Sequence, residues 1–270
     1  MKTSILLTVF NRPTQLRLSL DTLLRQDLSS LDYEIVVIND GQEDSTKKVI
    51  KEYSNLGFPI HYLFTGHRNK SNLIWRVPGF AYNIALQQCT SDIIVLTNTD
   101  VLHLNNTLVD IVKATENDPY ALGTLNEIYD DTGILIDYLT LQGLAPTKKL
   151  DRIIKQIKQI PDFTRDRAPR ADPRDPHLLA VRRKHLMDIG GYDEDFTGYA
   201  CEDTDLMNRL RDYGCYYNYT HGEAIHLFHG VRTTKRIGKQ KEYEHNLELL
   251  ISRQGRCYRN VNKKWGVPSV

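Results

Sequence analysis

Apolar and polar positions alternate in a regular way over the first half of the chain. Short apolar runs, several of them rich in β-branched residues, predict buried strands, and between them apolar residues recur at helical spacing, as Leu16, Leu20, Leu23 and Leu24 do. Pro13 precedes the first of these helices, where proline is favoured in the first turn. The predicted strands are 4–10, 33–38, 60–64 and 92–96, and the predicted helices are 14–25, 45–53, 79–88 and 108–116.

Strands that alternate with helices at this spacing predict an α/β fold with a mostly parallel sheet and crossover helices. Such sheets bind ligands beyond the carboxyl ends of their strands. Asn11 and Arg12 follow the first predicted strand, Asp40 follows the second, and Asp100 follows the fourth. We therefore expect these polar groups to converge on one edge of the sheet.

The second half of the chain is less regular. Residues 122–129 and 133–139 suggest a hairpin around Asp130, and residues 178–181 and 224–228 are short apolar strands. Helical spacing recurs over 148–160 and 242–252. Residues 161–176 are dense in Pro, Arg and Asp, which is typical of a loop and makes this segment a candidate lid. No internal repeat interrupts the pattern, and one α/β domain is the simplest organisation.

An acidic segment stands out between these elements. The glycine pair Gly190-Gly191 predicts a tight turn, and Glu202-Asp203 opens a predicted helix with Leu206 and Leu210 on one face. Near a helix start the dipole favours negative charge, which suits a general base. Ordinary capping by acidic residues is an equally good explanation for this segment alone.

Composition changes this picture little. The chain has 270 residues, 40% hydrophobic and 26% charged, with a formal net charge of +1, so no global charge favours nucleic acid. Residues 232–264, however, carry ten Lys or Arg and three Glu. This basic segment is compatible with contact to an anionic lipid surface, and equally with a solvated face.

The four cysteines, Cys89, Cys201, Cys215 and Cys257, form no CxxC pair and suit reduced thiols in a cytosolic protein. The apolar run near the N-terminus is too short for a signal peptide, and no run approaches the roughly 20 apolar residues of a membrane helix. We expect a cytoplasmic protein, with membrane contact limited to the periphery of the inner face.

A strand edge with carboxylates and an imidazole suits Mn²⁺ or another divalent ion. Asp40, Asp100, Asp203 and His229 are the candidates for such an edge. A metal with few protein ligands leaves coordination positions for a diphosphate, and a carboxylate away from it can take a proton from an attacking hydroxyl. The set therefore fits group transfer from a nucleotide.

Six segments, in order, resemble the GT-A glycosyltransferases, most closely the large family 2, with a C-terminal part similar to galactosyl- and N-acetylgalactosaminyltransferases. The resemblance runs from Ser4 to about Arg232. The segments are SILLTVFNR (4–12), VVINDG (36–41), GFAYNIA (79–85), DIIVLTNTD (92–100), IGGYDEDF (189–196) and EDTDL (202–206). It implies a GT-A fold, with a Rossmann-like, mostly parallel mixed sheet flanked by helices.

The resemblance also implies residue roles on the donor side. Thr8, Phe10 and Arg12 would line the nucleotide pocket, Asp40 would contact the uracil ring, and Asn83 would lie near the nucleotide or sugar. Asp40 before glycine also suits a plain turn, and Asn83 also suits packing or capping inside a helix.

Asn98-Thr99-Asp100 falls where the family has its Asp-x-Asp motif, so Asp100 would hold the metal. Asn98 replaces the first acid, which weakens the contacts implied for that position. His229 and, three residues on, Arg232 resemble a segment in which the His completes the metal site and the Arg meets the diphosphate. His226 is the rival ligand.

On the acceptor side, Asp203 matches the family's catalytic base and Glu202 would bind sugar hydroxyls. An Asp at this position resembles inverting members of the family. The sequence thus predicts a transferase that uses a UDP-sugar and Mn²⁺ or Mg²⁺ to glycosylate a hydroxyl of a glycan or lipid-linked oligosaccharide. We expect a catalytic domain over 1–230, divided into a nucleotide-binding half (1–120) and an acceptor half (121–230), and a basic helical extension over 231–270.

Two alternatives use the same residues. A nucleotidyltransferase would need a glycine-rich loop after the first strand, and residues 11–15 contain no glycine. A non-catalytic nucleotide-sugar or glycan-binding module is favoured by Asn98 and opposed by Asp100, Asp203 and His229. Binding to nucleic acid is not expected.

Overall fold

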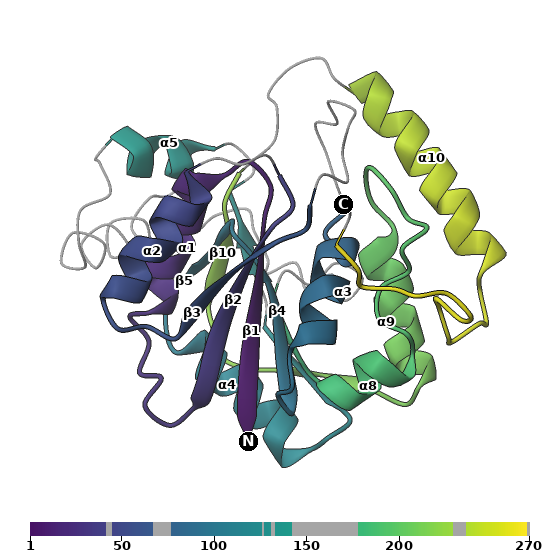
Figure 1. Cartoon of the computed structure of the whole chain (residues 1–270), viewed down its shortest axis with the longest axis horizontal. Coiled ribbons are helices and arrows are strands. Elements are labelled where there is room, and N and C mark those ends of the chain that lie inside the picture. The colour runs from purple at the N-terminus through teal and green to yellow at the C-terminus, as the bar shows by residue number, and fades with distance from the viewer. Residues whose placement is uncertain are drawn as a thin grey trace.

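The predicted strands form the centre of the molecule in the computed structural model, which describes residues 1–41, 45–66, 77–125, 127–130, 133–141, 178–228 and 236–268 (Figure 1). Within these residues a seven-stranded sheet has the order β3-β2-β1-β4-β8-β6-β9. Pairs β3–β2, β2–β1, β1–β4 and β6–β9 are parallel, and β8 is antiparallel to both of its neighbours. The strands are β1 (Lys2–Val9), β2 (Asp32–Asn39), β3 (Ile60–Phe64), β4 (Ile93–Asn98), β6 (Ala121–Thr124), β8 (Leu178–Arg182) and β9 (Tyr216–Tyr219).

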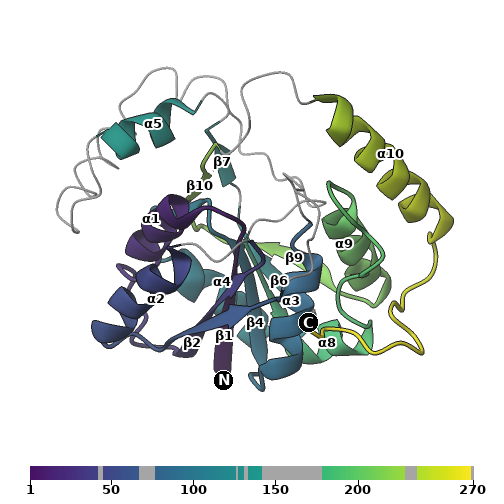
Figure 2. The ribbon, with the colours of Figure 1, turned by 45° about the horizontal axis from the view of Figure 1, so that its top comes forward.

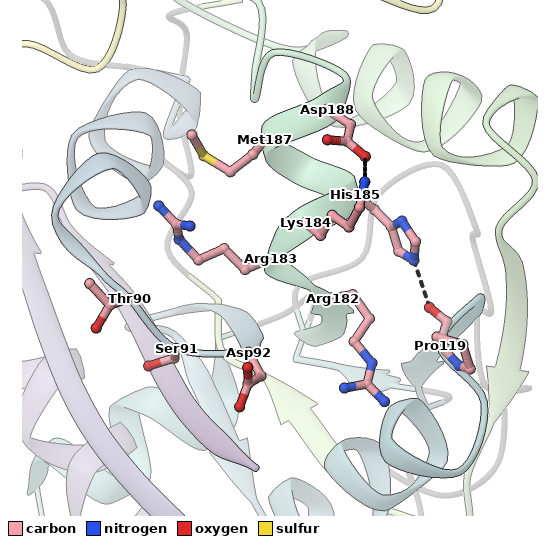
Figure 3. A pocket seen from close by; sticks show the side chains of 10 residues that line it. All are labelled: Thr90, Ser91, Asp92, Pro119, Arg182, Arg183, Lys184, His185, Met187 and Asp188. Atoms are coloured by element: carbon pink, nitrogen blue, oxygen red, sulfur yellow. Dashed lines mark hydrogen bonds and ion pairs between the residues drawn. The ribbon is translucent and has the colours of Figure 1, made fainter.

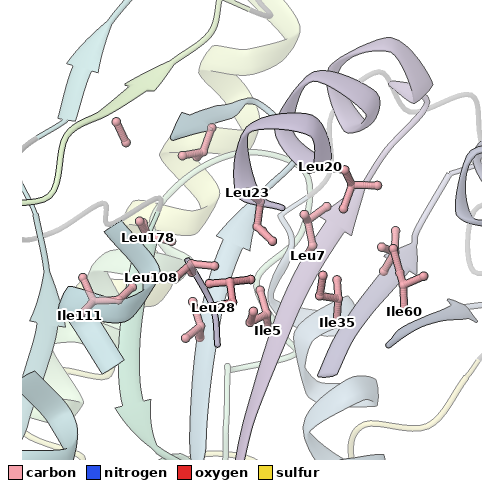
Figure 4. Close-up of a cluster of buried hydrophobic side chains, with 14 of the residues drawn as sticks. Ile5, Leu7, Leu20, Leu23, Leu28, Ile35, Ile60, Leu108, Ile111 and Leu178 are labelled. Carbon is pink, nitrogen blue, oxygen red and sulfur yellow. The ribbon is translucent and has the colours of Figure 1, made fainter. Parts of the chain in front are cut away.

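Helices cover both faces of this sheet because its central strands are apolar on both sides. Ile5 and Leu7 of β1 join a core under α1, α2 and α4 (Figure 4), whereas Leu6 between them joins a core under α3, α8 and α9. The result is a three-layer α/β/α arrangement, seen edge-on in Figure 2. The helices are α1 (Pro13–Leu23), α2 (Thr46–Asn55), α3 (Gly79–Gln88), α4 (Thr107–Asn117), α8 (Arg183–Asp188) and α9 (Glu202–Asp212).

A second, three-stranded sheet of order β5-β10-β7 lies beyond the end of β4. Its strands are β5 (Val101–His103), β7 (Glu127–Tyr129) and β10 (Ala224–His226). Because β10 runs antiparallel to β5, it lies beside the residues that directly follow Asp100.

The predicted hairpin around Asp130 is wrong. Residues 122–129 divide between β6 and β7 of different sheets, and α5 (Ile134–Leu141) replaces the second strand. Leu135, Ile136 and Leu139 are buried together at helical spacing. The Asp130 carboxylate accepts hydrogen bonds from the backbone N–H groups of Leu135 and Ile136, which satisfies amides that a helix start leaves unpaired.

The fold class is confirmed as a mixed, mostly parallel α/β sheet with flanking helices. Helix α10 (Arg236–Ser252), the last helix of the described residues, packs outside α9 (Figure 1). The predicted domain boundary at residue 230, the predicted helix 148–160 and the predicted lid 161–176 lie outside the described residues, and the division into domains stays a prediction.

Candidate active site

The ends of the three central strands meet, as their register requires. Thr8 of β1 lies opposite Asn98 of β4, and Val9 lies opposite Asn39 of β2. Gly41, just beyond β2, approaches the loop after β1 so closely that an added Cβ would lie 2.3 Å from Asn11 Oδ1. The predicted convergence of Asn11, Asp40 and Asp100 at one edge of the sheet therefore has a structural basis.

Asp40 is buried at this edge, and its Oδ1 accepts a hydrogen bond of 2.7 Å from the Thr65 hydroxyl. Its backbone N–H donates to the carbonyl of Val9, 2.8 Å away, which fixes the segment after β2 against the end of β1. Phe10, which directly follows β1, is partly buried. A carboxylate oriented in this way can accept a hydrogen bond from a base edge.

Asp100 lies between two basic side chains. Arg12 Nη1 is 3.0 Å from Asp100 Oδ2, and His226 Nε2 is 3.6 Å from Asp100 Oδ1. The Leu227 N–H donates to the Asp100 carbonyl at 2.7 Å, so β10 holds the histidine beside the carboxylate. Thr99, the middle residue of the predicted motif, is buried.

Two tyrosines connect this edge to the acidic helix. Tyr82 of α3 donates from its hydroxyl toward Asn98 Oδ1 at 3.0 Å and the Thr97 carbonyl at 2.7 Å, and Thr8 donates to the Tyr82 oxygen at 3.4 Å. The Tyr82 ring stacks on Tyr192 with 5.6 Å between ring centroids.

Tyr192 carries the connection to the predicted base. Its hydroxyl donates to Asp203 Oδ1 at 2.9 Å. Burial, and after it the negative charge of Asp203, raises the pKa of Tyr192 well above its ordinary value. The pKa of Tyr82 is raised by burial first, and also by Asp203, Asp100 and Glu202. Both tyrosines therefore remain protonated donors, and three predicted site carboxylates lie close to one phenol.

Glu202 and Asp203 occupy the first turn of α9, as the sequence indicates. The residue that precedes α9, Cys201, has φ 75°, and Ala200 before it has φ 71°. The helix dipole and the free N–H groups of a first turn favour the ionised form of a carboxylate there. Glu202 is buried, with 6% of its surface exposed.

Asn83 is fully buried and serves the glycine turn. Its amide donates to the Tyr192 carbonyl at 2.8 Å and to Glu194 Oε1 at 3.0 Å, and its Oδ1 accepts from the Tyr192 N–H. Gly191, at φ 65°, approaches so closely that a Cβ would lie 2.4 Å from Asn83 Oδ1. The role implied for Asn83 toward the nucleotide stays a prediction.

The basic C-terminal segment is partly neutralised by this acidic region. Arg253 pairs with Asp193 and Asp195, and Lys263 Nζ is 2.8 Å from Asp195 Oδ1. Arg259 lies deeper and pairs with Asp193. These side chains are engaged with the protein rather than displayed to a lipid surface.

A pocket of about 510 Å³ lies at the opposite end of the sheet (Figure 3). Arg182, Arg183 and His185 line it, but their polar groups hydrogen-bond to the carbonyls of Glu116, Leu86 and Pro119, at or just beyond the ends of α4 and α3. Such contacts stabilise helix C-termini. This pocket is a junction between elements, remote from the strand ends that carry the candidate site.

His229 and Arg232 lie outside the described residues. Within the described ranges, no three His, Cys, Asp or Glu side chains gather as a metal site, and no helix is long and apolar enough to cross a membrane. Sequence reasoning missed Tyr82 and Tyr192 as site residues. Tyr82 lies inside the segment GFAYNIA and Tyr192 inside IGGYDEDF, and their position in these two segments was the signal that could have identified them.

Comparison with known proteins agrees with this architecture. The family model described as glycosyl transferase family 2 matches residues 4–166. A second family model, described as the N-terminal domain of galactosyltransferase, matches residues 178–246. Together the two matches extend from Ser4 in β1 into α10.

Relatives of known sequence span several activities. Validoxylamine A glucosyltransferase of Streptomyces hygroscopicus subsp. limoneus is 26% identical over 227 residues, covering 78% of this chain and 48% of that protein. Hyaluronan synthase of Pasteurella multocida is 24% identical over 276 residues, covering 93% of this chain and 27% of that protein. The chain thus spans about half, or less, of the length of these relatives.

Solved structures share the fold. GalNAc-T7 with UDP, GalNAc and Mn²⁺ superimposes with a TM-score of 0.61 at 14% identity, covering 92% of this chain and 48% of that one. The mannosyltransferase PcManGT of Pyrobaculum calidifontis, with GDP-Man and Mn²⁺, gives 0.59 at 14% identity over 93% and 63%. S. aureus TarS 1–349 with UDP-GlcNAc gives 0.55 at 15% identity over 93% and 66%.

Proposed function

Because the chain belongs to glycosyl transferase family 2, we propose that it is a metal-dependent, inverting glycosyltransferase. Its donor is a UDP-sugar that carries a hexose or N-acetylhexosamine, and its acceptor is a hydroxyl of a glycan or lipid-linked oligosaccharide. Asp203 is the general base. Glu202 binds sugar hydroxyls beside it.

One observation carries the proposal. The carboxylate at the start of α9 is joined through Tyr192 and Tyr82 to the edge formed by Thr8 and Asn98. A donor bound at the strand ends would therefore have its reacting carbon beside a fixed carboxylate. Holding two substrates and a catalytic group in a fixed geometry lowers the barrier of such a group transfer.

On the donor side, Thr8, Phe10, Arg12 and Asp40 would form the nucleotide pocket. The structure of PcManGT is a complex with GDP-Man, and that of TarS 1–349 is a complex with UDP-GlcNAc. The fold alone therefore does not determine the nucleobase of the donor. The choice of UDP depends on Asp40, whose buried carboxylate would accept a hydrogen bond from the uracil N–H. Arg232 would meet the diphosphate.

In the reaction, Asp203 takes the proton of the acceptor hydroxyl as that oxygen attacks the anomeric carbon. A new carbon–oxygen bond forms on one face of the sugar while the bond to the diphosphate oxygen breaks on the other. The electron pair of that bond leaves with UDP, and the sugar is inverted. Tyr192, which donates to Asp203 Oδ1, orients the carboxylate for this transfer.

The donor set at Asp100 fits a divalent cation. A carboxylate with an imidazole 3.6 Å from one oxygen offers the ligand types that Mn²⁺ accepts. Asp100 would be the direct ligand, with His229 as the histidine implied by the resemblance and His226 as its rival. Bound Mn²⁺ or Mg²⁺ supplies positive charge that offsets the charge of the leaving diphosphate. Asn98 and Thr99 lie beside this site.

Peripheral contact with an anionic membrane surface from the cytoplasmic side would have to use basic residues of 232–264 other than Arg253, Arg259 and Lys263, which are engaged in ion pairs. Flotation with phosphatidylserine vesicles tests it. Binding at low salt that disappears at high salt supports membrane contact, and no binding at low salt excludes it.

The function is tested first by thermal shift with UDP or GDP, each with Mn²⁺, and by release of nucleotide from a panel of UDP-sugars and GDP-mannose. At a ligand concentration of 100 Kd, binding stabilises the fold by about 2.7 kcal/mol. Asp100→Ala should lose the Mn²⁺-dependent shift. Asp92→Ala, at the other end of β4 and exposed, is its matched control.

Asp203→Asn separates the enzyme from the non-catalytic alternative that Asn98 suggests. It should keep the UDP-dependent thermal shift and lose transfer, whereas Asp212→Asn, the exposed acid at the far end of α9, should keep both. Nucleotide binding without turnover of any donor, with a range of glycan acceptors, would favour the binding module. Absence of any nucleotide-dependent shift would remove the nucleotide-sugar proposal altogether.

A further inference from the structure

The loop before the proposed base has an unusual backbone. Ala200 and Cys201 both have positive φ, 71° and 75°, although neither is glycine. Such residues persist only where surrounding contacts determine the backbone. Cys201 makes no side-chain capping bond to α9. The contacts that hold this loop must therefore come from elsewhere in the chain.

They come from Asn246, in the middle of α10. Its side chain is fully buried, at 0% exposure. Its Nδ2 lies 2.7 Å from the carbonyl of Thr197 and 2.9 Å from the carbonyls of both Tyr199 and Ala200. Its Oδ1 accepts from the Thr197 N–H at 3.4 Å. One amide thus organises the whole loop.

We propose that Asn246 is a positioning residue for Asp203, acting through the loop 197–201. This inference rests on the proposed function, in which Asp203 is the base. The Cys201 carbonyl accepts the first helical hydrogen bond of α9 from the Asp205 N–H at 2.9 Å. The orientation of the peptides held by Asn246 therefore sets the direction of the turn that carries Asp203.

The residues after α10 hold the same segment at both ends. Arg259 Nε is 3.1 Å from Asp193 Oδ2, and its Nη2 is 2.5 Å from Asp205 Oδ1. Asp193 precedes the loop and Asp205 follows the base by two residues. The C-terminal segment thus fixes the chain before, within and after the loop.

Only an amide suits position 246. It supplies two hydrogens for three carbonyl acceptors, and its oxygen accepts from a backbone N–H. The carboxylate of Asn246→Asp has the same shape but no hydrogen to donate, and it would face three carbonyl oxygens. Asn246→Ala removes the contacts without adding charge. The matched control is Gln240→Ala. The Gln240 side chain is exposed, and its amide donates to the Glu244 carboxylate on the same helix.

The first readout is the division between kcat and KM. Misplacement of a catalytic group by about 1 Å can cost roughly 100-fold in rate. In Asn246→Ala and Asn246→Asp we expect kcat to fall roughly 10- to 100-fold, with an unchanged donor KM and an unchanged thermal shift from UDP and Mn²⁺. Gln240→Ala should match the wild type. A folded Asn246 variant with wild-type kcat, or with only a raised donor KM, would overturn the proposal.

The second readout is a double-mutant cycle with Asp203→Asn. If Asn246 acts through the base, Asn246→Ala should reduce the residual rate of Asp203→Asn by less than about twofold. A full multiplicative loss in the double variant contradicts the proposal. Retention of activity in Asp203→Asn alone would instead contradict the proposed function, so the two failures are distinguishable.

A loss of folding in Asn246→Ala is addressed by adding Ala200→Gly, since glycine adopts positive φ without strain. This double variant should regain thermal stability and still show the reduced kcat. Recovery of wild-type kcat along with stability would reduce Asn246 to a structural residue.

Discussion

The buried ion-pair network around Arg259 gives the sharpest stability prediction. The Arg259 side chain is 5% exposed, and its partners Asp193 and Asp205 are 1% and 2% exposed. Removing one partner of a buried pair typically costs about 3–5 kcal/mol, because a buried charge is left uncompensated. Here Asp193 keeps Arg253 and Asp205 keeps Arg209, at 2.7 Å.

These second partners place the cost of Arg259→Met at the lower end, about 3 kcal/mol. For a chain of this size each kcal/mol lowers the melting temperature by about 2–4 °C, so a loss of about 6–12 °C is expected. Arg256→Met is the matched control, since Arg256 is exposed three residues earlier. Exposed substitutions usually change stability by less than about 0.5 kcal/mol.

Differential scanning fluorimetry of the two variants, at low salt and at roughly 0.5 M NaCl as an assay condition, measures both the cost and its origin. A buried pair is screened little, so the Arg259→Met deficit should persist at high salt. Equal melting temperatures for Arg259→Met and Arg256→Met would refute the reasoning. A deficit that disappears in high salt would mean that the pairs behave as surface pairs.

Three further predictions concern single side chains. Tyr192→Phe keeps the ring but removes the 2.9 Å hydrogen bond to Asp203, so kcat in the transfer assay should fall roughly tenfold with donor KM unchanged; an unchanged kcat would exclude this role. Ala200→Gly relieves a positive φ of 71° and should raise the melting temperature by about 2–4 °C; a lower melting temperature would contradict the strain. Burial lowers the pKa of His103 to about 3, so below about pH 6.5 only the unfolded chain takes up this proton, and stability falls toward acid by up to about 1.4 kcal/mol per pH unit. Urea unfolding between about pH 7 and pH 4 should show that this slope is reduced in His103→Gln, whereas an equal slope in both proteins would rule out this source.

Local patterns were sufficient for most of the fold. The leucines of α1 recur at helical spacing, and β1 contains the apolar run Ile5-Leu6-Leu7, so each segment indicates its own structure. The prediction for the segment that forms α5 failed because six of its eight residues are apolar, a pattern that fits a strand and a helix equally well. What decides is Asp130, whose carboxylate accepts from two N–H groups of the first turn.

The site was predictable only where a strand end marks it. Asp40 and Asp100 follow apolar runs, and β-sheet register then brings them together. Tyr82 and Tyr192 stack across more than 100 residues of sequence, and no local periodicity encodes such a pair. The same holds for Asn246 and Arg259, which the sequence offered only as members of a basic tail.

The choice between His226 and His229 shows how the second sheet matters to the chemistry. Alternation along a strand could not decide which face His226 occupies, but antiparallel pairing with β5 places it 3.6 Å from Asp100. If His226 is the ligand, His226→Ala should weaken the Mn²⁺-dependent thermal shift with UDP, and His229→Ala should leave it intact. The reverse pattern, with the shift lost in His229→Ala and kept in His226→Ala, would make His229 the ligand.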